Sequence, residues 1–427
     1  MTNQTAWRRW FAMASIIFIG EAIFALPFHI TRFFRPTMLE VFGLSNFQLG
    51  AMFSAYGFVA MAAYGPGGTL ADRFSAKKLM ALAAFLTSAG GMLMLRIPSK
   101  TVMTALYGYW GLTTILLWAA MIRSTREWGG NGNQGRAFGL LDGGRGLVAA
   151  AAATLIVFLY KMVLPDDVAS ATVTEQAAGL RTVIISYSVM TVLAGVLVLL
   201  FVSEETKEHS VEATPNNYSG ESVLLVLKQP STWLISLIVI CAYCGYKGMD
   251  NYSVFAVDAY GMSEVEAAEL STWAAWVRPT SAIGVGIFAD RISSTKATAV
   301  SFAILILSYL SFLVLEPAPG KMTVFYLTIF FSAVAIYGLR GVYFAIMEEV
   351  DVPRHATGTA VGIISLVGYT PDIFIMPVAG WLIDRSPGAT GHQHFYGVLM
   401  LFSLIGLIAV IALRKQGRKT AHLESAA

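Results

Sequence analysis

Long apolar stretches separated by short polar segments recur along the whole chain. A helix of about 20 residues crosses the ~30 Å hydrocarbon core of a bilayer, and each stretch is long enough to do so. The stretches fall at about residues 10–36, 46–71, 78–97, 101–123, 136–163, 181–203, 231–257, 264–289, 297–315, 322–347, 355–383 and 394–413. This pattern predicts an all-α integral membrane protein with twelve transmembrane helices.

The longest polar connection divides these stretches into two sets of six. It reads SEETKEHSVEATPNNYSGES over residues 203–222 and lies between the sixth and seventh stretches. We therefore expect two pseudo-symmetric six-helix bundles, at 1–202 and 230–415. A cytoplasmic linker at 203–229 would join them, and a cytoplasmic tail would occupy 416–427.

The composition agrees with a membrane protein and excludes several other classes. The 427 residues are 56% hydrophobic and only 13% charged, with a mean hydropathy of +0.64, whereas soluble domains carry about 25% charged residues. A net charge of +3 gives no reason to expect a nucleic-acid partner. Cys241 and Cys244 lie in an apolar stretch without a nearby histidine, and no span carries a nucleophile–base pair or a metal-ligand cluster. We expect a monomer that is not an enzyme and has no cofactor.

The charges of the loops predict the orientation in the membrane. Arg8 and Arg9 precede the first apolar stretch and no cleavage signal follows, so this stretch is expected to remain as a transmembrane helix. With the N-terminus inside, 17 of the 29 Lys and Arg residues fall in inner segments and seven in outer segments. Cytoplasmic loops are the ones enriched in Lys and Arg. Both termini are therefore predicted to lie in the cytoplasm, with the chain in the cell inner membrane.

A short motif occurs at equivalent positions in the two halves. GTLADRFSAKK (68–78) follows the second stretch, and GIFADRISSTK (286–296) follows the eighth. Duplicated halves are typical of secondary transporters. The motif resembles the signature loop of the major facilitator superfamily, and this resemblance covers essentially the whole chain. It implies a cytoplasmic gate formed by Gly68, Asp72, Arg73, Gly286, Asp290 and Arg291. The alternative is that these charges only orient the helices.

Charged residues inside the predicted spans point to a binding site, because such residues usually face a cavity or one another. The basic ones are Arg32, Arg145, Lys247, Arg278 and Arg340, and the acidic ones are Glu21, Asp142, Asp250 and Asp372. Arg32 and Lys247 lie in the first span of each half, so pseudo-symmetry predicts that they face one cavity and bind an anion.

Structural pairing within a span is the competing interpretation of these charges. Lys247 could pair with Asp250 one turn away, and Asp142 could pair with Arg145. Arg278 could bind the carbonyls freed by Pro279. For Arg340 three alternatives remain open: a place in the cavity, or pairing with Glu21 or Asp372. Arg35, just before Pro36, is expected to reach the outer interface.

Four segments resemble one branch of the superfamily, the organophosphate:phosphate antiporters and their sugar-phosphate and organic-anion relatives. They are HITR (29–32), YKGMDNYS (246–253), IYGLRG (336–341) and TGTAVGIISLVGY (357–369). The branch grips phosphate with a basic residue in each of spans one and seven, assisted by a histidine in span five. Arg32 matches the first, Lys247 stands where an arginine is usual, and Arg145 stands where the histidine is expected. Because lysine acts as a point charge, a carboxylate or sulfonate is as suitable as a phosphate.

The resulting hypothesis is a transporter that moves a small organic anion by alternating access. His29, Tyr246 and Tyr369 are added to the predicted binding site, because His29 neighbours Arg32 and a tyrosine ring can stack on a sugar. Coupling would use exchange for inorganic phosphate or proton symport. The carboxylates considered for proton coupling are Asp142, Asp250, Asp372 and Glu21. The alternatives are a transporter-fold anion sensor and an efflux pump for small drugs.

Overall fold

The computed structural model describes most of the chain. The described residues are 6–130, 134–165, 167–203, 224, 226–318, 321–349 and 357–426. Within these ranges the side chains of residues 6, 65–73, 134–135, 169, 348, 357–359 and 417–426 are left out. The predicted linker therefore lies largely outside the described residues.

The described residues form helices and no strands, which confirms the predicted all-α class. The α-helices are α1 (Ala6–Ala22), α2 (Ile30–Phe33), α3 (Arg35–Phe42), α4 (Asn46–Arg73), α5 (Ala76–Met94), α6 (Lys100–Gly129), α7 (Gln134–Lys161), α8 (Val173–Phe201), α10 (Pro230–Gly248), α11 (Tyr252–Tyr260), α12 (Glu264–Ile292), α13 (Ser294–Val314), α14 (Met322–Val342), α15 (Thr357–Gly368), α16 (Pro371–Arg385) and α17 (Ala389–Ala426). Short turns of other helix types are η1 (Ala25–His29), η2 (Val168–Ser170), η4 (Met249–Asn251) and η6 (Ala345–Glu349).

Among the described residues, nine helical segments are long and apolar enough to cross a membrane. The other three predicted spans are also helical: α4 has 28 residues, α5 has 19 and α12 has 29. At about 1.5 Å per residue, even α5 is about 28 Å long. A helix satisfies all its backbone hydrogen bonds internally, which is why apolar stretches of this length become helices in lipid.

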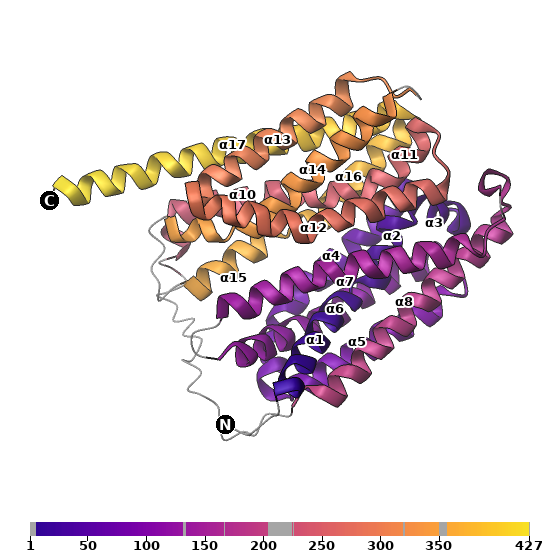
Figure 1. Ribbon diagram of the computed structural model, residues 1–427, viewed down its shortest axis with the longest axis horizontal. Helices are drawn as coiled ribbons and strands as arrows, with labels where there is room; N and C mark the ends of the chain where they lie inside the picture. Colours follow the sequence, from indigo (N-terminus) through magenta and orange to yellow (C-terminus); the bar gives the residue numbers. More distant parts are fainter. Residues whose placement is uncertain are drawn as a thin grey trace. The chain divides into compact units, whose positions relative to one another are not determined.

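Three of the spans are interrupted rather than continuous. The first span passes from α1 through the π-helix η1 to α2 and then α3. Pro27 lies inside η1, where its missing N–H removes an α-helical hydrogen bond. The 3-10 turn η4 separates α10 from α11, and a break after Gly368 separates α15 from α16. In Figure 1 the indigo part of the chain runs from α1, near the N-terminus, to α2 and α3.

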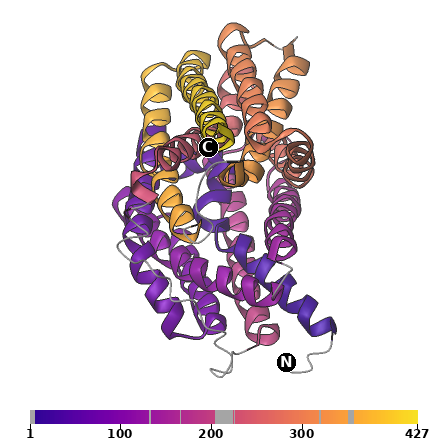
Figure 2. The ribbon, with the colours of Figure 1, turned by 90° about the vertical axis from the view of Figure 1, so that its left-hand side faces the viewer.

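The chain forms two compact units that do not follow the order of the sequence. Unit 1 comprises Met1–Thr206, Asp250–Pro279 and Met376–Asp384, and unit 2 comprises the remaining residues. In unit 1, α4 packs on α6, α5 packs on α6 and α8, and α1 packs on α7 and α8. In unit 2, α13 packs on α14 and on α17. Helix α13 (orange) and helix α17 (yellow) lie side by side in Figure 2. The bounds expected for two six-helix bundles stay a prediction.

Candidate functional site

Arg32 forms a buried ion pair within unit 1. Its Nε donates to Oδ1 of Asp250 at 2.5 Å, and the Oγ of Ser253 donates to the Arg32 carbonyl at 3.2 Å. Arg32 lies on α2, directly after the π-helix, and Asp250 lies in the 3-10 turn η4. Both side chains are buried. The partner of Arg32 is thus 218 positions away in the sequence, beyond the reach of a helical-neighbour rule.

Lys247 forms a second ion pair, within unit 2. Its Nζ lies 3.3 Å from Oδ1 of Asp372, and Lys247 is almost fully buried. The hydroxyl of Tyr243 donates to the same carboxylate at 3.0 and 3.2 Å. Lys247 and Asp250, which the sequence places one helical turn apart, thus each contact a residue from a distant span. Lys247 joins Asp372, and Asp250 joins Arg32.

Aromatic side chains adjoin the Lys247 pair. The ring of Tyr243 lies 4.9 Å from that of Tyr369 and 5.6 Å from that of Tyr246. The guanidinium of Arg340 stands 3.9 Å from the centroid of the Tyr246 ring, which is cation–π geometry. Unit 2 thus gathers the predicted residues Lys247, Tyr246 and Tyr369 with Tyr243.

Glu21 is the centre of a cluster of charged side chains in unit 1. Its Oε1 lies 3.2 Å from Nε2 of His29 and 3.3 Å from Nη1 of Arg278, and its Oε2 lies 3.2 Å from Nε of Arg145. The side chain of Glu21 is only 5% exposed. The predicted residues His29 and Arg145 therefore share one carboxylate, and Arg278 joins them.

Arg278 makes contacts that its position beside Pro279 does not predict. It contacts Glu21 and, at 3.3 Å, Oδ1 of Asp142. Helix α12 continues through Pro279. Gly146 makes room for the guanidinium, because an added Cβ would lie 3.1 Å from two carbons of Arg278. In the sequence, the signal for this cluster is an arginine inside one predicted span and acidic residues inside others. Hydropathy does not say which spans are neighbours, so the contacts could not be assigned from it.

Asp142 should contribute little to stability, although it contacts the same arginine. Its side chain is 49% exposed, so water stabilises the carboxylate and the ion pair is worth about 0–1 kcal/mol. We expect Asp142→Asn to lower the free energy of unfolding by less than about 1 kcal/mol. Unfolding of the purified variant in detergent measures this. A loss above about 2 kcal/mol would mean that Asp142 is an essential part of the cluster.

The predicted gate residues are described only in part. Asp290 and Arg291 are exposed at the end of α12, and no heavy atom of the described residues lies within 4 Å of a Cβ added to Gly286. Helix α4 reaches Arg73, but the side chains of Gly68, Asp72 and Arg73 lie outside the described residues. The gate therefore stays a prediction.

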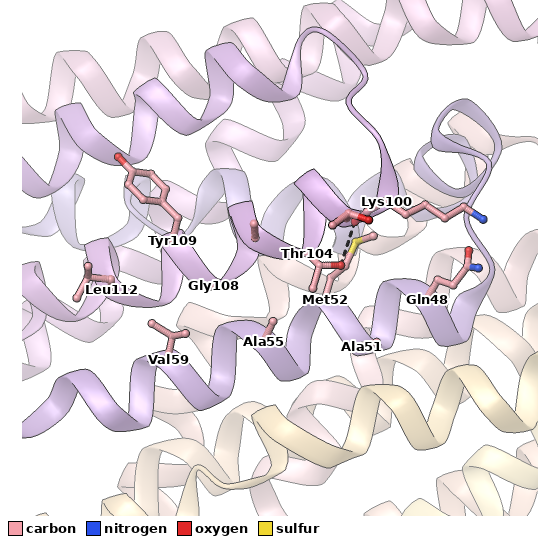
Figure 3. A pocket seen from close by; sticks show the side chains of 12 residues that line it. Gln48, Ala51, Met52, Ala55, Val59, Lys100, Thr104, Gly108, Tyr109 and Leu112 are labelled. Atoms are coloured by element: carbon pink, nitrogen blue, oxygen red, sulfur yellow. Dashed lines mark hydrogen bonds between the residues drawn. The ribbon is translucent and has the colours of Figure 1, made fainter.

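An open hollow between α4 and α6 contains none of the predicted site residues. It measures about 870 Å³ and is lined mainly by small and apolar side chains such as Ala55, Val59 and Leu112 (Figure 3). Lys100 and Gln48 lie together at one end of it. Its apolar walls suit hydrocarbon and not a small charged molecule.

The family follows from comparison with known proteins. Residues 17–371 match the family model described as Major Facilitator Superfamily. The chain belongs to this superfamily. As a superfamily member it is a multi-pass membrane transporter, and its fold and transporter class are as predicted from the motif. The organophosphate branch and the orientation of the termini stay predictions.

Two curated relatives are inner membrane proteins of Escherichia coli K12. YqcE is 28% identical over 415 residues, which cover 96% of this chain and 95% of YqcE. YihN is 24% identical over 420 residues, covering 96% of each chain. These relatives support a location in the inner membrane for this transporter.

Solved structures share the fold at low sequence identity. A bacterial homolog of the human lysosomal transporter Spinster, inward-facing and unoccupied, has a TM-score of 0.74 at 15% identity and covers 98% of this chain and 99% of its own. The nucleoside transporter NupG has a TM-score of 0.69 at 13% identity, covering 97% and 100%. Identities this low establish the fold alone.

Proposed function

We propose that this transporter carries a small organic anion across the inner membrane by alternating access, coupled to protons or to exchange of a second anion. The observation that carries the proposal is the buried Arg32–Asp250 pair beside two helix interruptions. Transporters of this kind bind substrates where transmembrane helices are discontinuous.

The buried ion pairs favour a functional role over a structural one. Removing two charges from water is costly, and apolar residues of similar size often give equal or greater stability. Unit 1 contains the Arg32–Asp250 pair and unit 2 contains the Lys247–Asp372 pair. The protein therefore gains little stability from either ion pair. In each pair, the protein's carboxylate occupies the position that an anionic ligand would take.

The residues around the pairs suggest the substrate class. A guanidinium can bind a carboxylate, sulfonate or phosphate with two parallel hydrogen bonds, whereas an ammonium acts as a point charge. The rings of Tyr243, Tyr246 and Tyr369 could stack on a sugar. We therefore favour a sugar phosphate, a sugar acid or a sulfonate, in keeping with the resemblance to the organophosphate branch.

Competition within the ion pairs offers a route to proton coupling. Protonation of Asp250 or Asp372 would release Arg32 or Lys247 for the anion, and loss of the proton would displace the anion. Glu21 contacts three basic side chains, so we assign it to holding the cluster together. With this assignment Asp250 and Asp372 are the preferred carriers, ahead of Asp142.

The proposal is tested by measuring the Tm of the purified protein in detergent with each anion of a panel. The panel contains phosphate, sugar phosphates, uronates, sugar sulfonates and dicarboxylates. A ligand at 100 times its Kd stabilises the native state by about 2.7 kcal/mol. We expect one class of anion to raise the Tm of the wild type and to have no effect on Arg32→Ala or Lys247→Ala. Arg96→Ala is the matched control, because Arg96 is an exposed arginine and its loss should leave the shift intact.

Two outcomes would contradict this proposal. If neutral nucleosides or cations stabilise the protein and no anion does, Arg32 and Lys247 have structural roles. If an anion binds but does not cross the membrane of proteoliposomes, the protein is a sensor and not a carrier.

A further inference from the structure

The chain contains a third copy of the G-x-x-x-D-R pattern, at the end of α16. It reads Gly380-Trp-Leu-Ile-Asp384-Arg385, with the same spacing as the copies that begin at Gly68 and Gly286. Those two copies end the second and eighth predicted spans. The third ends the eleventh, an odd-numbered span, so it belongs to the opposite face of the membrane.

The carboxylate of Asp384 caps the N-terminus of α4. Its Oδ1 accepts from the backbone N of Asn46 at 3.0 Å and from Nδ2 of Asn46 at 3.1 Å, and its Oδ2 accepts from the backbone N of Phe47 at 2.8 Å. The first N–H groups of a helix lack internal partners, and the helix dipole favours a negative charge there. Asp384 thus satisfies donors that α4 cannot satisfy by itself.

Arg35 extends this contact to a third helix. Its Nη2 donates to Oδ1 of Asn46 at 3.1 Å and its Nε does so at 3.3 Å. Arg35 is fully buried, so its guanidinium binds Asn46 instead of extending into water, and its place near the outer interface stays a prediction. Helices α3, α4 and α16 therefore meet around Asn46, and all these contacts lie within unit 1.

Two glycines bring the backbones of α4 and α16 into contact. A Cβ added to Gly380 would lie 2.3 Å from the carbonyl O of Asn46, and one added to Gly50 would lie 2.5 Å from the carbonyl O of Met376. Such distances are too short for any side chain, so these two positions require glycine while the helices touch.

A second contact joins the two predicted halves in the same unit. Glu264, at the start of α12, accepts from the hydroxyl of Thr37 at 2.5 Å and from that of Tyr160 at 2.9 Å. Thr37 is on α3 and Tyr160 is near the end of α7. The starts of α4 and α12 and the ends of α3, α7 and α16 belong to one face of the membrane by their order in the chain.

We propose that the Gly380–Asp384 motif is a latch that closes this face of the transporter and opens when substrate enters or leaves there. Helix α4 carries the latch at its first residue and the predicted gate motif at its last turn. The length of this 28-residue helix places its first and last residues about 40 Å apart. Asp384 is exposed, so its hydrogen bonds can exchange with water and break at low cost. The latch rests on the proposed alternating access, but not on the identity of the substrate.

A single reporter cysteine tests the latch without any substrate. The reporter is Met376→Cys in a Cys241→Ala/Cys244→Ala background, because the Met376 side chain is fully buried and its backbone carbonyl lies against Gly50. A membrane-impermeant maleimide is applied to right-side-out and inside-out vesicles. We expect Asp384→Ala to raise the labelling rate about fivefold from the latch face only, as loss of a typical helix cap would. Gly380→Ala should raise it at least as much.

Matched variants decide between the latch and a general loss of structure. Asp384→Glu keeps the carboxylate and should restore slow labelling, and Asp384→Asn replaces the alanine variant if that one does not fold. Gly284→Ala adds a methyl group that has no heavy atom of the described residues within 4 Å, and Asp290→Ala removes an acid of the opposite face. Neither should speed labelling from the latch face. Unchanged rates in Asp384→Ala and Gly380→Ala, with full labelling after denaturation, would overturn the latch and leave the anion proposal untouched.

Discussion

Replacing Glu21 by glutamine is expected to lower the free energy of unfolding by about 3–5 kcal/mol. Glu21 lies within 3.3 Å of basic nitrogens of Arg145, Arg278 and His29. Glutamine keeps the shape of the side chain but removes the negative charge, so two buried guanidinium groups lose the carboxylate that they share. Chemical unfolding of the purified variant in detergent, compared with the wild type, measures the loss.

The exposed neighbour Asp142 provides the control for Glu21→Gln. Both carboxylates contact Arg278, but only Glu21 is buried, so Asp142→Asn should cost far less. The double variant Glu21→Gln/Arg278→Gln should be less destabilised than the sum of the two single variants, because the second change removes a charge that the first left without its partner. A Glu21→Gln variant within about 1 kcal/mol of the wild type would contradict the structural role of Glu21.

The second large effect is expected from Asp250→Asn. This change leaves Arg32 without the carboxylate that lies 2.5 Å from its Nε. The unliganded protein should be less stable, because a buried charge has lost its partner. An anionic substrate no longer competes with Asp250, so its affinity should rise at least tenfold, which corresponds to about 1.4 kcal/mol. Binding should also lose most of its dependence on pH, and uptake should no longer follow a proton gradient while anion exchange persists.

Three measurements check Asp250→Asn together. They are the ligand-induced shift in Tm between pH 5.5 and pH 8, uptake driven by a pH gradient, and counterflow exchange in proteoliposomes. Asp372→Asn is the matched variant, because it removes the carboxylate beside Lys247 and identifies which pair carries the proton. Unchanged anion affinity in Asp250→Asn would show that Asp250 does not compete with the substrate. Full proton-driven uptake in both variants would exclude both carboxylates as the proton carrier.

The helices could be predicted closely from the apolar pattern, but their interruptions could not. The first and seventh spans were expected at 10–36 and 231–257 as continuous helices. The structure breaks them at η1, shortly before Arg32, and at η4, which contains Asp250. Hydropathy averages over about twenty residues, so it registers the length of a span and misses a turn of different helix type inside it.

The charged residues inside the spans could be found from the sequence, whereas their contacts with residues of distant spans could not. The sequence suggested partners one turn apart, such as Lys247 with Asp250 and Asp142 with Arg145. In the structure Lys247 contacts Asp372, and Asp250 contacts Arg32. Asp142 contacts Arg278, and Arg145 contacts Glu21. Neighbours along one helix can be counted from the sequence, whereas contacts between helices depend on which spans pack together and at what depth.

The sequence by itself therefore determined the membrane location, the helical class and the superfamily. Lipid offers no hydrogen-bond partners, so a long apolar stretch has almost no alternative to a helix, and the repeated motif is local. Only the tertiary structure decided which acid neutralises which base, the burial of Arg35, and the contact of Asp384 with the start of α4. These depend on side chains brought together from distant spans, where close packing and the cost of an unpaired buried charge select the partners.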